Sequence, residues 1–115
     1  MTSTAFQKMA HFDGEEAVAR AGQKDGTPLV LSSNSNTTIE KFAENNQDSP
    51  KFYQIYMSRS KDVNIDIWDR VKRAGFKGFA LTCDTQLLGK RYQDVRNKFN
   101  LPHHLSIANY EKYKN

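Results

Sequence analysis

Three short apolar runs interrupt an otherwise polar chain, at Pro28–Leu31, Phe52–Met57 and Gly78–Cys83. Each run is bounded by turn-forming or polar residues, a pattern typical of β-strands. Their centres lie about 25 residues apart, which leaves room for one strand and one helical crossover. The pattern therefore predicts three strands with helices between them.

The polar segments before and between these runs carry helix signals. Asp13 is a predicted N-cap of the first helix, and Gly26 follows its expected end. Thr37 and Glu40 have the spacing of a capping box, which predicts the start of the second helix. The third helix is predicted from apolar residues at every fourth position: Val63, Ile67 and Val71.

Alternating strands and helices predict an α/β fold with a parallel sheet, because each crossover returns the chain to the same edge. Two architectures fit, an open doubly wound sheet and part of a (β/α)8 barrel. Three strands alone make a thin core with two open sheet edges. The expected fold is therefore a partial (β/α)8 TIM barrel of about three parallel strands, formed by residues 1–115.

Composition places the 115 residues among globular sequences of one domain, with 37% hydrophobic and 26% charged residues. The net charge is +4, but basic and acidic residues alternate and form no long run of one sign. This charge pattern favours solvent-exposed helix faces over a surface that binds nucleic acid. Cys83 is the only cysteine, which excludes an intrachain disulfide and favours a reducing compartment; in an apolar run it is expected to be a small buried residue.

Targeting signals are not evident in these residues. No apolar stretch approaches the ~20 residues of a membrane span, and the first residues lack the apolar segment of a secretory signal. The last three residues, Tyr113-Lys114-Asn115, differ from a peroxisomal Ser-Lys-Leu signal. An intracellular location is expected.

Polar residues cluster where the predicted strands end. Ser32 follows the first strand, Gln54 and Tyr56 lie two apart in the second, and Thr82 and Asp84 lie two apart in the third. Residues two apart in a strand share a face, and carboxyl ends of parallel strands converge at ligand sites. These positions predict a site for a polar, planar ligand; the alternative is that they are ordinary capping and loop residues.

Other common site patterns are not present in the sequence. His103 and His104 are adjacent and have no acidic or cysteine residue at helical spacing to complete a metal site. The six glycines are scattered and form no phosphate-binding loop. No metal site is expected.

Several separate motifs resemble one known family. The segments "TAFQKMAH.DGE", "LSS", "QIY", "LT.DT..LGKR..DVRNKF.LP.HL" and "ANY" together are similar to the FMN-dependent 2-hydroxy-acid dehydrogenases and oxidases. The eukaryotic glycolate and long-chain hydroxy-acid oxidases are the most similar in character. The resemblance covers nearly the whole chain and implies barrel units two to four of an FMN hydroxy-acid dehydrogenase domain.

The resemblance also implies roles for individual residues. Thr4 and Ala5 match the loop whose backbone faces the flavin ring, and Asp84 matches an acidic residue near the active centre. The side chains matching those that hydrogen-bond the flavin are Ser32, Gln54 and Thr82. The residues matching the substrate-binding groups are Tyr56 and Arg91, with Arg91 clamping the carboxylate by two hydrogen bonds.

The chain departs from the family pattern in places. The family usually has proline at the positions of Ser3, Phe12 and Gln86, and tryptophan at that of Asn34. The segment "MSRSKD" after Tyr56 replaces an aromatic-rich turn. The family's general-base histidine is matched by none of the three histidines, so no catalytic residue is assigned here.

Three functions follow as alternatives. The resemblance implies FMN-dependent oxidation of (S)-2-hydroxy acids to 2-oxo acids, with O2 or another electron acceptor and formation of H2O2, in the peroxisome or cytoplasm. The expected partners are a small hydroxy acid and further copies of the chain, not nucleic acid or membrane. A truncated, non-catalytic family member is the second reading, and a basic module binding nucleic acid or an acidic partner is the third.

Overall fold

A computed structural model describes residues 1–85, 87 and 89–114. Its sheet contains three parallel strands in the order β1 (Leu29–Leu31), β2 (Lys51–Ile55) and β3 (Gly78–Leu81). The three predicted strands are confirmed. The second and third end two residues earlier than the apolar runs suggested.

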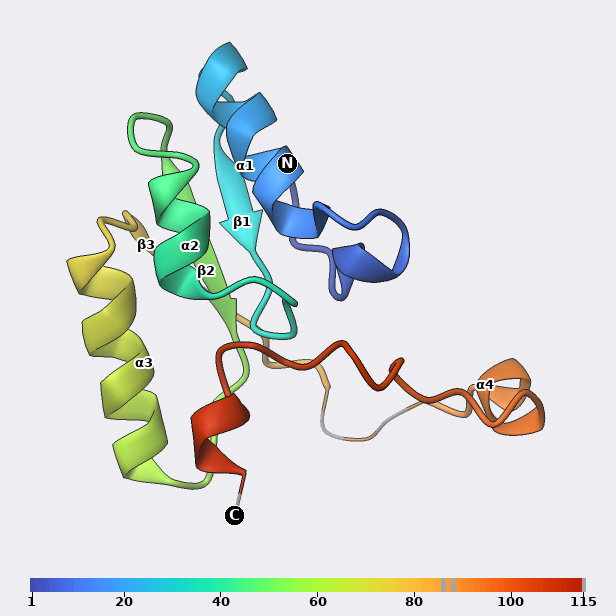
Figure 1. Cartoon of the computed structure of the whole chain (residues 1–115). Coiled ribbons are helices and arrows are strands. Elements are labelled where there is room, and N and C mark those ends of the chain that lie inside the picture. Colours follow the sequence, from blue (N-terminus) through green and yellow to red (C-terminus); the bar gives the residue numbers. More distant parts are fainter. Residues whose placement is uncertain (86, 88, 115) are drawn as a thin grey trace.

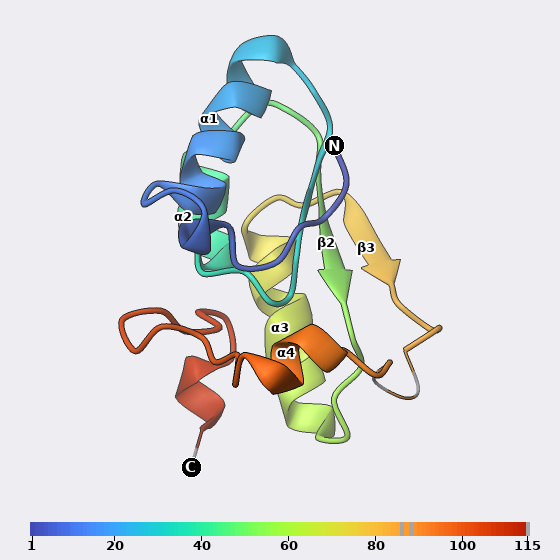
Figure 2. The same cartoon turned by 90° about the vertical axis from the view of Figure 1, so that its right-hand side faces the viewer.

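Each strand is preceded by one helix, and the three helices cover one side of the sheet only (Figure 1). They are α1 (Gly14–Asp25), α2 (Ile39–Glu44) and α3 (Lys61–Arg73). Figure 2 shows these helices together on one side of the strands and an open opposite side. A doubly wound sheet has helices on both faces, whereas a barrel has them only outside. The arrangement therefore corresponds to part of a (β/α)8 barrel.

The remaining elements are short. A 3-10 turn, η1 (Gln7–Met9), precedes α1, while α4 (Tyr92–Arg96) and the 3-10 turn η2 (Glu111–Tyr113) follow β3. Within the described residues, no helix has the length and apolar character needed to cross a membrane.

The predicted helix boundaries are right for α1 and wrong by one residue for α2. Asp13 occupies the N-cap of α1, and Gly26 ends it with a φ of 65°. At α2 the N-cap is Thr38, whose side chain accepts the Lys41 backbone N–H at 3.2 Å. Thr37 is buried instead, and its hydroxyl donates to Glu15 at 3.1 Å. The capping box between Thr37 and Glu40 is therefore not formed.

The apolar core lies between the sheet and the helices. Strand residues Leu31, Tyr53 and Ile55 point to the helix side, where Ile67 and Val71 of α3 are also buried, as their spacing predicted. Cys83 differs from expectation: it is exposed, because it follows β3, an edge strand whose last three residues are also exposed.

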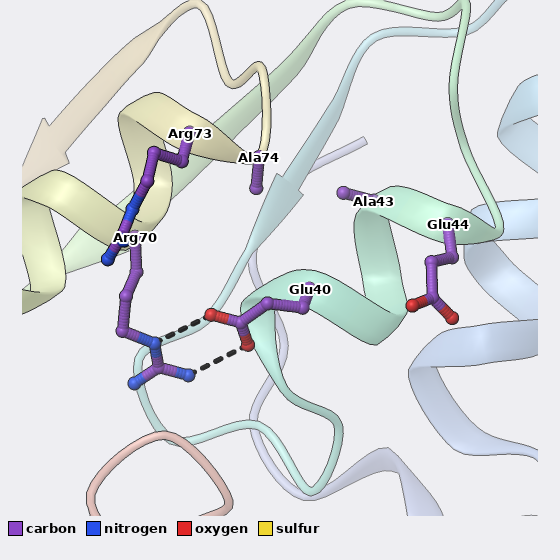
Figure 3. Close-up of a pocket in the computed structure, with 6 residues that line it drawn as sticks. All are labelled: Glu40, Ala43, Glu44, Arg70, Arg73 and Ala74. Atoms are coloured by element: carbon purple, nitrogen blue, oxygen red, sulfur yellow. Dashed lines mark hydrogen bonds and ion pairs between the residues drawn. The ribbon is translucent and has the colours of Figure 1, made fainter.

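A groove of about 490 Å³ separates α2 from α3 and is bridged by one ion pair (Figure 3). The Arg70 guanidinium donates to both Glu40 carboxylate oxygens, from Nε at 2.7 Å and from Nη2 at 2.9 Å. Arg70 also donates to the backbone oxygen of Asn109 at 3.1 Å. The hydrogen bond from Arg70 lowers the pKa of the Glu40 carboxyl below its usual value. The pair therefore fixes the spacing of the two helices.

This ion pair predicts a loss of stability in acid. Because the pKa of Glu40 is lower in the folded chain, its contribution is present at neutral pH and is lost as the pH falls through the pKa of the folded carboxyl. Asp66, whose pKa is lowered by hydrogen bonds from Lys112 and Tyr113, contributes in the same direction. Glu40→Gln should reduce the acid dependence of the free energy of unfolding by about 1 kcal/mol, since the carboxylate is half-exposed.

Urea unfolding between pH 3 and 7 measures this dependence. Glu44→Gln is the matched control, because Glu44 is an exposed neighbour paired only with Lys41 of its own helix. An unchanged acid slope in Glu40→Gln would contradict the role given to the pair.

Candidate functional site at the carboxyl ends of the strands

A ladder of hydrogen bonds joins the ends of all three strands. Gln54 lies at its centre: its Oε1 accepts from Ser33 N at 3.2 Å, Ser33 Oγ at 3.3 Å and Ser32 Oγ at 3.4 Å. On the other side, Gln54 Nε2 donates to Thr82 Oγ1 at 2.8 Å. Three of the predicted cofactor-binding residues are thus brought together, with Ser33 as an additional member. We call these four residues the strand-end ladder.

The strand register explains this meeting. Tyr53 and Ile55 point to the helices, so Gln54 between them points to the opposite face. The Thr82 backbone N–H donates to Ile55 O at 3.0 Å and continues the parallel pairing one residue past β3. The side chain of Thr82 therefore emerges beside that of Gln54.

The ladder has free hydrogen-bond donors beside Ala80, a small residue that leaves space for a ligand. Gln54 Nε2 has a second N–H, and the Thr82 hydroxyl has a proton beyond the bond that its oxygen accepts. Ala80, the partner of Gln54 in the sheet, carries only a methyl group. This donor set fits a flat heterocycle with carbonyl oxygens and ring nitrogens, as in a flavin ring.

The loop containing Thr4 and Ala5 lies at the end of β1. The Phe6 backbone N–H donates to Asn34 O at 3.2 Å, two residues after Ser32. Phe6 has a φ of 54°, a left-handed conformation that costs a bulky residue about 1 kcal/mol and turns the chain sharply. Thr4 and Ala5 are exposed and line a hollow with apolar residues of α1. The loop is therefore positioned close to the ladder through backbone contact with β1.

The predicted substrate-binding residues are not joined to the ladder. Tyr56, 40% exposed, follows β2 directly. Arg91 is the N-cap of α4, is exposed and pairs with Asp94 at 3.9 Å. Figure 1 shows α4 beyond the carboxyl ends of the strands and well to one side. Their roles, like that of exposed Asp84, stay predictions, and Gln86 lies outside the described residues.

The histidines lie elsewhere in the described part of the chain. His11 stacks on Phe12 near η1, with ring centroids 4.4 Å apart, and His103 and His104 are exposed. Over the described ranges, no three histidine, cysteine or acidic side chains come together as a metal site.

A buried carboxylate holds the N-terminal loop in place. Glu15 is 1% exposed and accepts from the backbone N–H groups of Gln7 at 3.2 Å and Asn36 at 3.1 Å, and from Thr37 Oγ1. These partners come from η1 and from the segment after β1. Glu15 thereby connects the loop of Thr4 and Ala5 with the segment that follows Ser32.

A buried asparagine fixes the C-terminal segment in a similar way. Asn109 is fully buried; its Oδ1 accepts from Ile39 N at 2.8 Å, and its Nδ2 donates to Ser35 Oγ at 3.1 Å. Ala108 N also donates to Ser35 O at 3.1 Å. The last residues therefore support the start of α2.

The sequence places Ser33 among the polar residues that end the first strand but assigns it no role, and it does not identify Glu15 as important to the site. A glutamate in the first turn of a helix usually faces solvent and interacts favourably with the helix dipole. The sequence therefore gives no sign that Glu15 is buried. For Ser33 the doubled serine after an apolar run is the only hint.

Comparisons with known proteins match the chain to one family. Residues 1–115 match the family model described as FMN-dependent dehydrogenase. The chain is 44% identical over 108 residues to glycolate oxidase 1 of Zea mays, and 40% identical over 109 residues to 2-hydroxyacid oxidase 1 of Mus musculus. These matches cover 94% and 95% of this chain but only 29% and 30% of the relatives.

Solved structures give the same result. The lactate oxidase of Pediococcus acidilactici superposes with a TM-score of 0.90 at 34% identity, over 97% of this chain and 32% of that one. A soluble mutant of the (S)-mandelate dehydrogenase of Pseudomonas putida superposes with a TM-score of 0.88 at 30% identity, over 96% of this chain and 31% of that one.

The fold is thus part of the barrel found in this class of oxidases and dehydrogenases. The chain belongs to the FMN-dependent dehydrogenase family, whose cofactor is FMN. It spans about three tenths of the length of the relatives it matches.

The buried position of Glu15 predicts a large effect of its removal. Glu15→Ala leaves three donors without their acceptor and should lower the free energy of unfolding by about 3 kcal/mol. Amide hydrogen exchange at Gln7 and Asn36 should accelerate. Urea unfolding and exchange NMR measure both effects.

Glu16→Ala is the matched control for this variant. Glu16 is the next residue of α1, is more exposed and pairs with Lys8. Its removal should cost less than about 1 kcal/mol. Equal and small losses of unfolding free energy in Glu15→Ala and Glu16→Ala would show that Glu15 does not hold the loop.

Proposed function

We propose that this chain supplies part of the flavin-binding and substrate-binding edge of an enzyme that oxidises (S)-2-hydroxy acids to 2-oxo acids. The observation that carries the proposal is the strand-end ladder at the carboxyl ends of parallel barrel strands. That edge is where barrel enzymes bind their ligands. Residues 1–115 would form barrel units two to four.

The cofactor contacts come from the ladder and the N-terminal loop. Ser32, Gln54 and Thr82 would hold the polar edge of the flavin by hydrogen bonds, and the backbone of Thr4 and Ala5 would lie against its ring. The fit rests on the donor groups of Gln54 and Thr82 and on the bond from Phe6 to Asn34, which holds that loop beside β1. Bound FMN would supply the acceptor for the hydride on the substrate carbon that carries the hydroxyl group.

Substrate contacts come from Tyr56 and Arg91. A guanidinium can donate two parallel hydrogen bonds to a carboxylate, which orients a 2-hydroxy acid. The proposal requires Arg91 to lie above the strand ends when substrate is bound. The names of the relatives, glycolate oxidase and 2-hydroxyacid oxidase, support a small hydroxy acid as substrate.

The electron and proton balance is simple. The substrate loses a hydride and a hydroxyl proton, which amount to two electrons and two protons; together they convert O2 to H2O2, or they pass to another acceptor. A base for the hydroxyl proton is not assigned to any residue of this chain. A non-catalytic family member that binds flavin weakly is the alternative, and a peroxisomal or cytoplasmic location is proposed from the family.

FMN titration tests the cofactor role. The protein is a chimera in which this chain replaces the matching segment of the Zea mays glycolate oxidase, with the 115-residue chain measured in parallel. Thr82→Val removes one hydroxyl from the ladder and should weaken FMN binding about tenfold, as followed by flavin fluorescence. Bleaching of bound flavin by glycolate or lactate without oxygen would support turnover.

Thr85→Val is the matched control, because Thr85 is exposed in the same loop and its hydroxyl donates to Asp84 rather than to a member of the ladder. It should change FMN affinity less than about twofold. A folded chimera that binds no FMN would overturn the cofactor role, while binding without bleaching would favour the non-catalytic alternative.

The substrate role of Arg91 is tested by Arg91→Lys in the same chimera. Loss of two parallel hydrogen bonds should raise KM for the hydroxy acid about thirtyfold. Arg96→Lys, in the same short helix, is the control and should leave KM unchanged. An unchanged KM in Arg91→Lys would refute the clamp.

A further inference from the structure

Hydrogen-bond donors at the end of β1 determine the orientation of the Gln54 side-chain amide. Three donors converge on Oε1, and two of them belong to Ser33: its backbone N–H and its hydroxyl. A backbone N–H can only donate, so it requires the amide oxygen rather than the NH2 group opposite it. A flipped amide would set N–H against N–H within a buried site.

The orientation of the Gln54 amide also determines the hydrogen bond made to the residue after β3. With its oxygen toward Ser33, Gln54 directs its NH2 group toward β3, where Nε2 donates to Thr82 Oγ1 at 2.8 Å. Thr82 accepts that bond, so its own proton is available to an acceptor on the open face. Exposure increases in the same direction, from 1% at Ser33 and 6% at Gln54 to the half-buried Thr82.

We propose that Ser33 is a positioning residue that sets the direction of hydrogen bonding along the ladder, from Ser33 through Gln54 to Thr82. The edge then presents two donors, the second Nε2 proton of Gln54 and the Thr82 hydroxyl proton. The ligand atoms opposite them are acceptors, either ring carbonyl oxygens or an unprotonated ring nitrogen. The identity of that ligand as a flavin rests on the proposed function.

A consequence for flavin chemistry follows. Donors beside ring acceptors stabilise the electron-rich reduced ring more than the oxidised ring. A residue that aims those donors therefore raises the reduction potential without touching the flavin. Ser33, 1% exposed, acts in this way only through Gln54.

The first test needs no cofactor. In the 15N-labelled chain, Ser33→Ala should accelerate solvent exchange of the Gln54 side-chain NH2 about tenfold, because the amide loses one of the bonds that hold it. Ser33→Thr retains the hydroxyl and should restore slow exchange. Ser33→Pro also removes the backbone N–H that selects the amide oxygen. Unchanged exchange in both Ser33→Ala and Ser33→Pro would overturn the proposal even if FMN binds normally.

The second test uses the FMN-loaded chimera. Ser33→Ala should shift the reduction potential of bound flavin to a more negative value, and Ser33→Thr should return it toward that of the parent. Ser49→Ala is the matched control: Ser49 is also buried and donates one bond, to Gly22 O at 2.7 Å, but it lies before β2 at the other end of the strand.

The outcomes separate this inference from the proposed function. Ser49→Ala can lower stability but should change neither Gln54 exchange nor the potential. An equal potential shift in Ser33→Ala and Ser49→Ala would reduce Ser33 to a structural role and overturn the inference. If the chimera bound no FMN, the proposed function would fail, while the exchange measurement would still decide whether Ser33 orients Gln54.

Discussion

Parallel pairing of β2 with both of its neighbours is the constraint on which the rest of the structure depends. It fixes the alternation of side chains, so that Tyr53 and Ile55 complete the core while Gln54 faces the opposite side. A shift of one residue would exchange these faces, burying an amide among apolar groups and exposing a tyrosine. The same register that forms the core therefore forms the strand-end ladder.

The segments around the sheet are held largely by buried polar side chains. Glu15 and Asn109 each bond to the chain just after Ser33, one from α1 and the other from the C-terminal segment. A short chain offers little apolar surface for fixing loops, whereas a buried acceptor that binds several donors is costly to separate from them. The loop of Thr4 and Ala5 gains its position from this arrangement.

Helices cover one face of the sheet and the opposite face is open. This is the arrangement expected of a chain that spans about three tenths of the length of its barrel relatives. On the outer side of β3, Phe79 and Leu81 are about half-exposed, beside the similarly exposed Trp68 of α3. In a complete barrel every strand has two neighbours, so such an edge does not occur. The described residues thus contain an intact strand-end ladder on an incomplete barrel.

The sequence by itself determined the alternation of strands and helices, the buried face of α3 and the polar residues at the strand ends. These features follow from periodicities that involve residues only a few positions apart. Tertiary packing is the reason that Thr38 rather than Thr37 caps α2, that Glu15 is buried, and that Ser33 donates to Gln54. The deciding partners are remote in the chain: Thr37 bonds to Glu15 over 22 positions, and Ser33 to Gln54 over 21. Contacts at such separations depend on how the strands and helices pack, which no local pattern encodes.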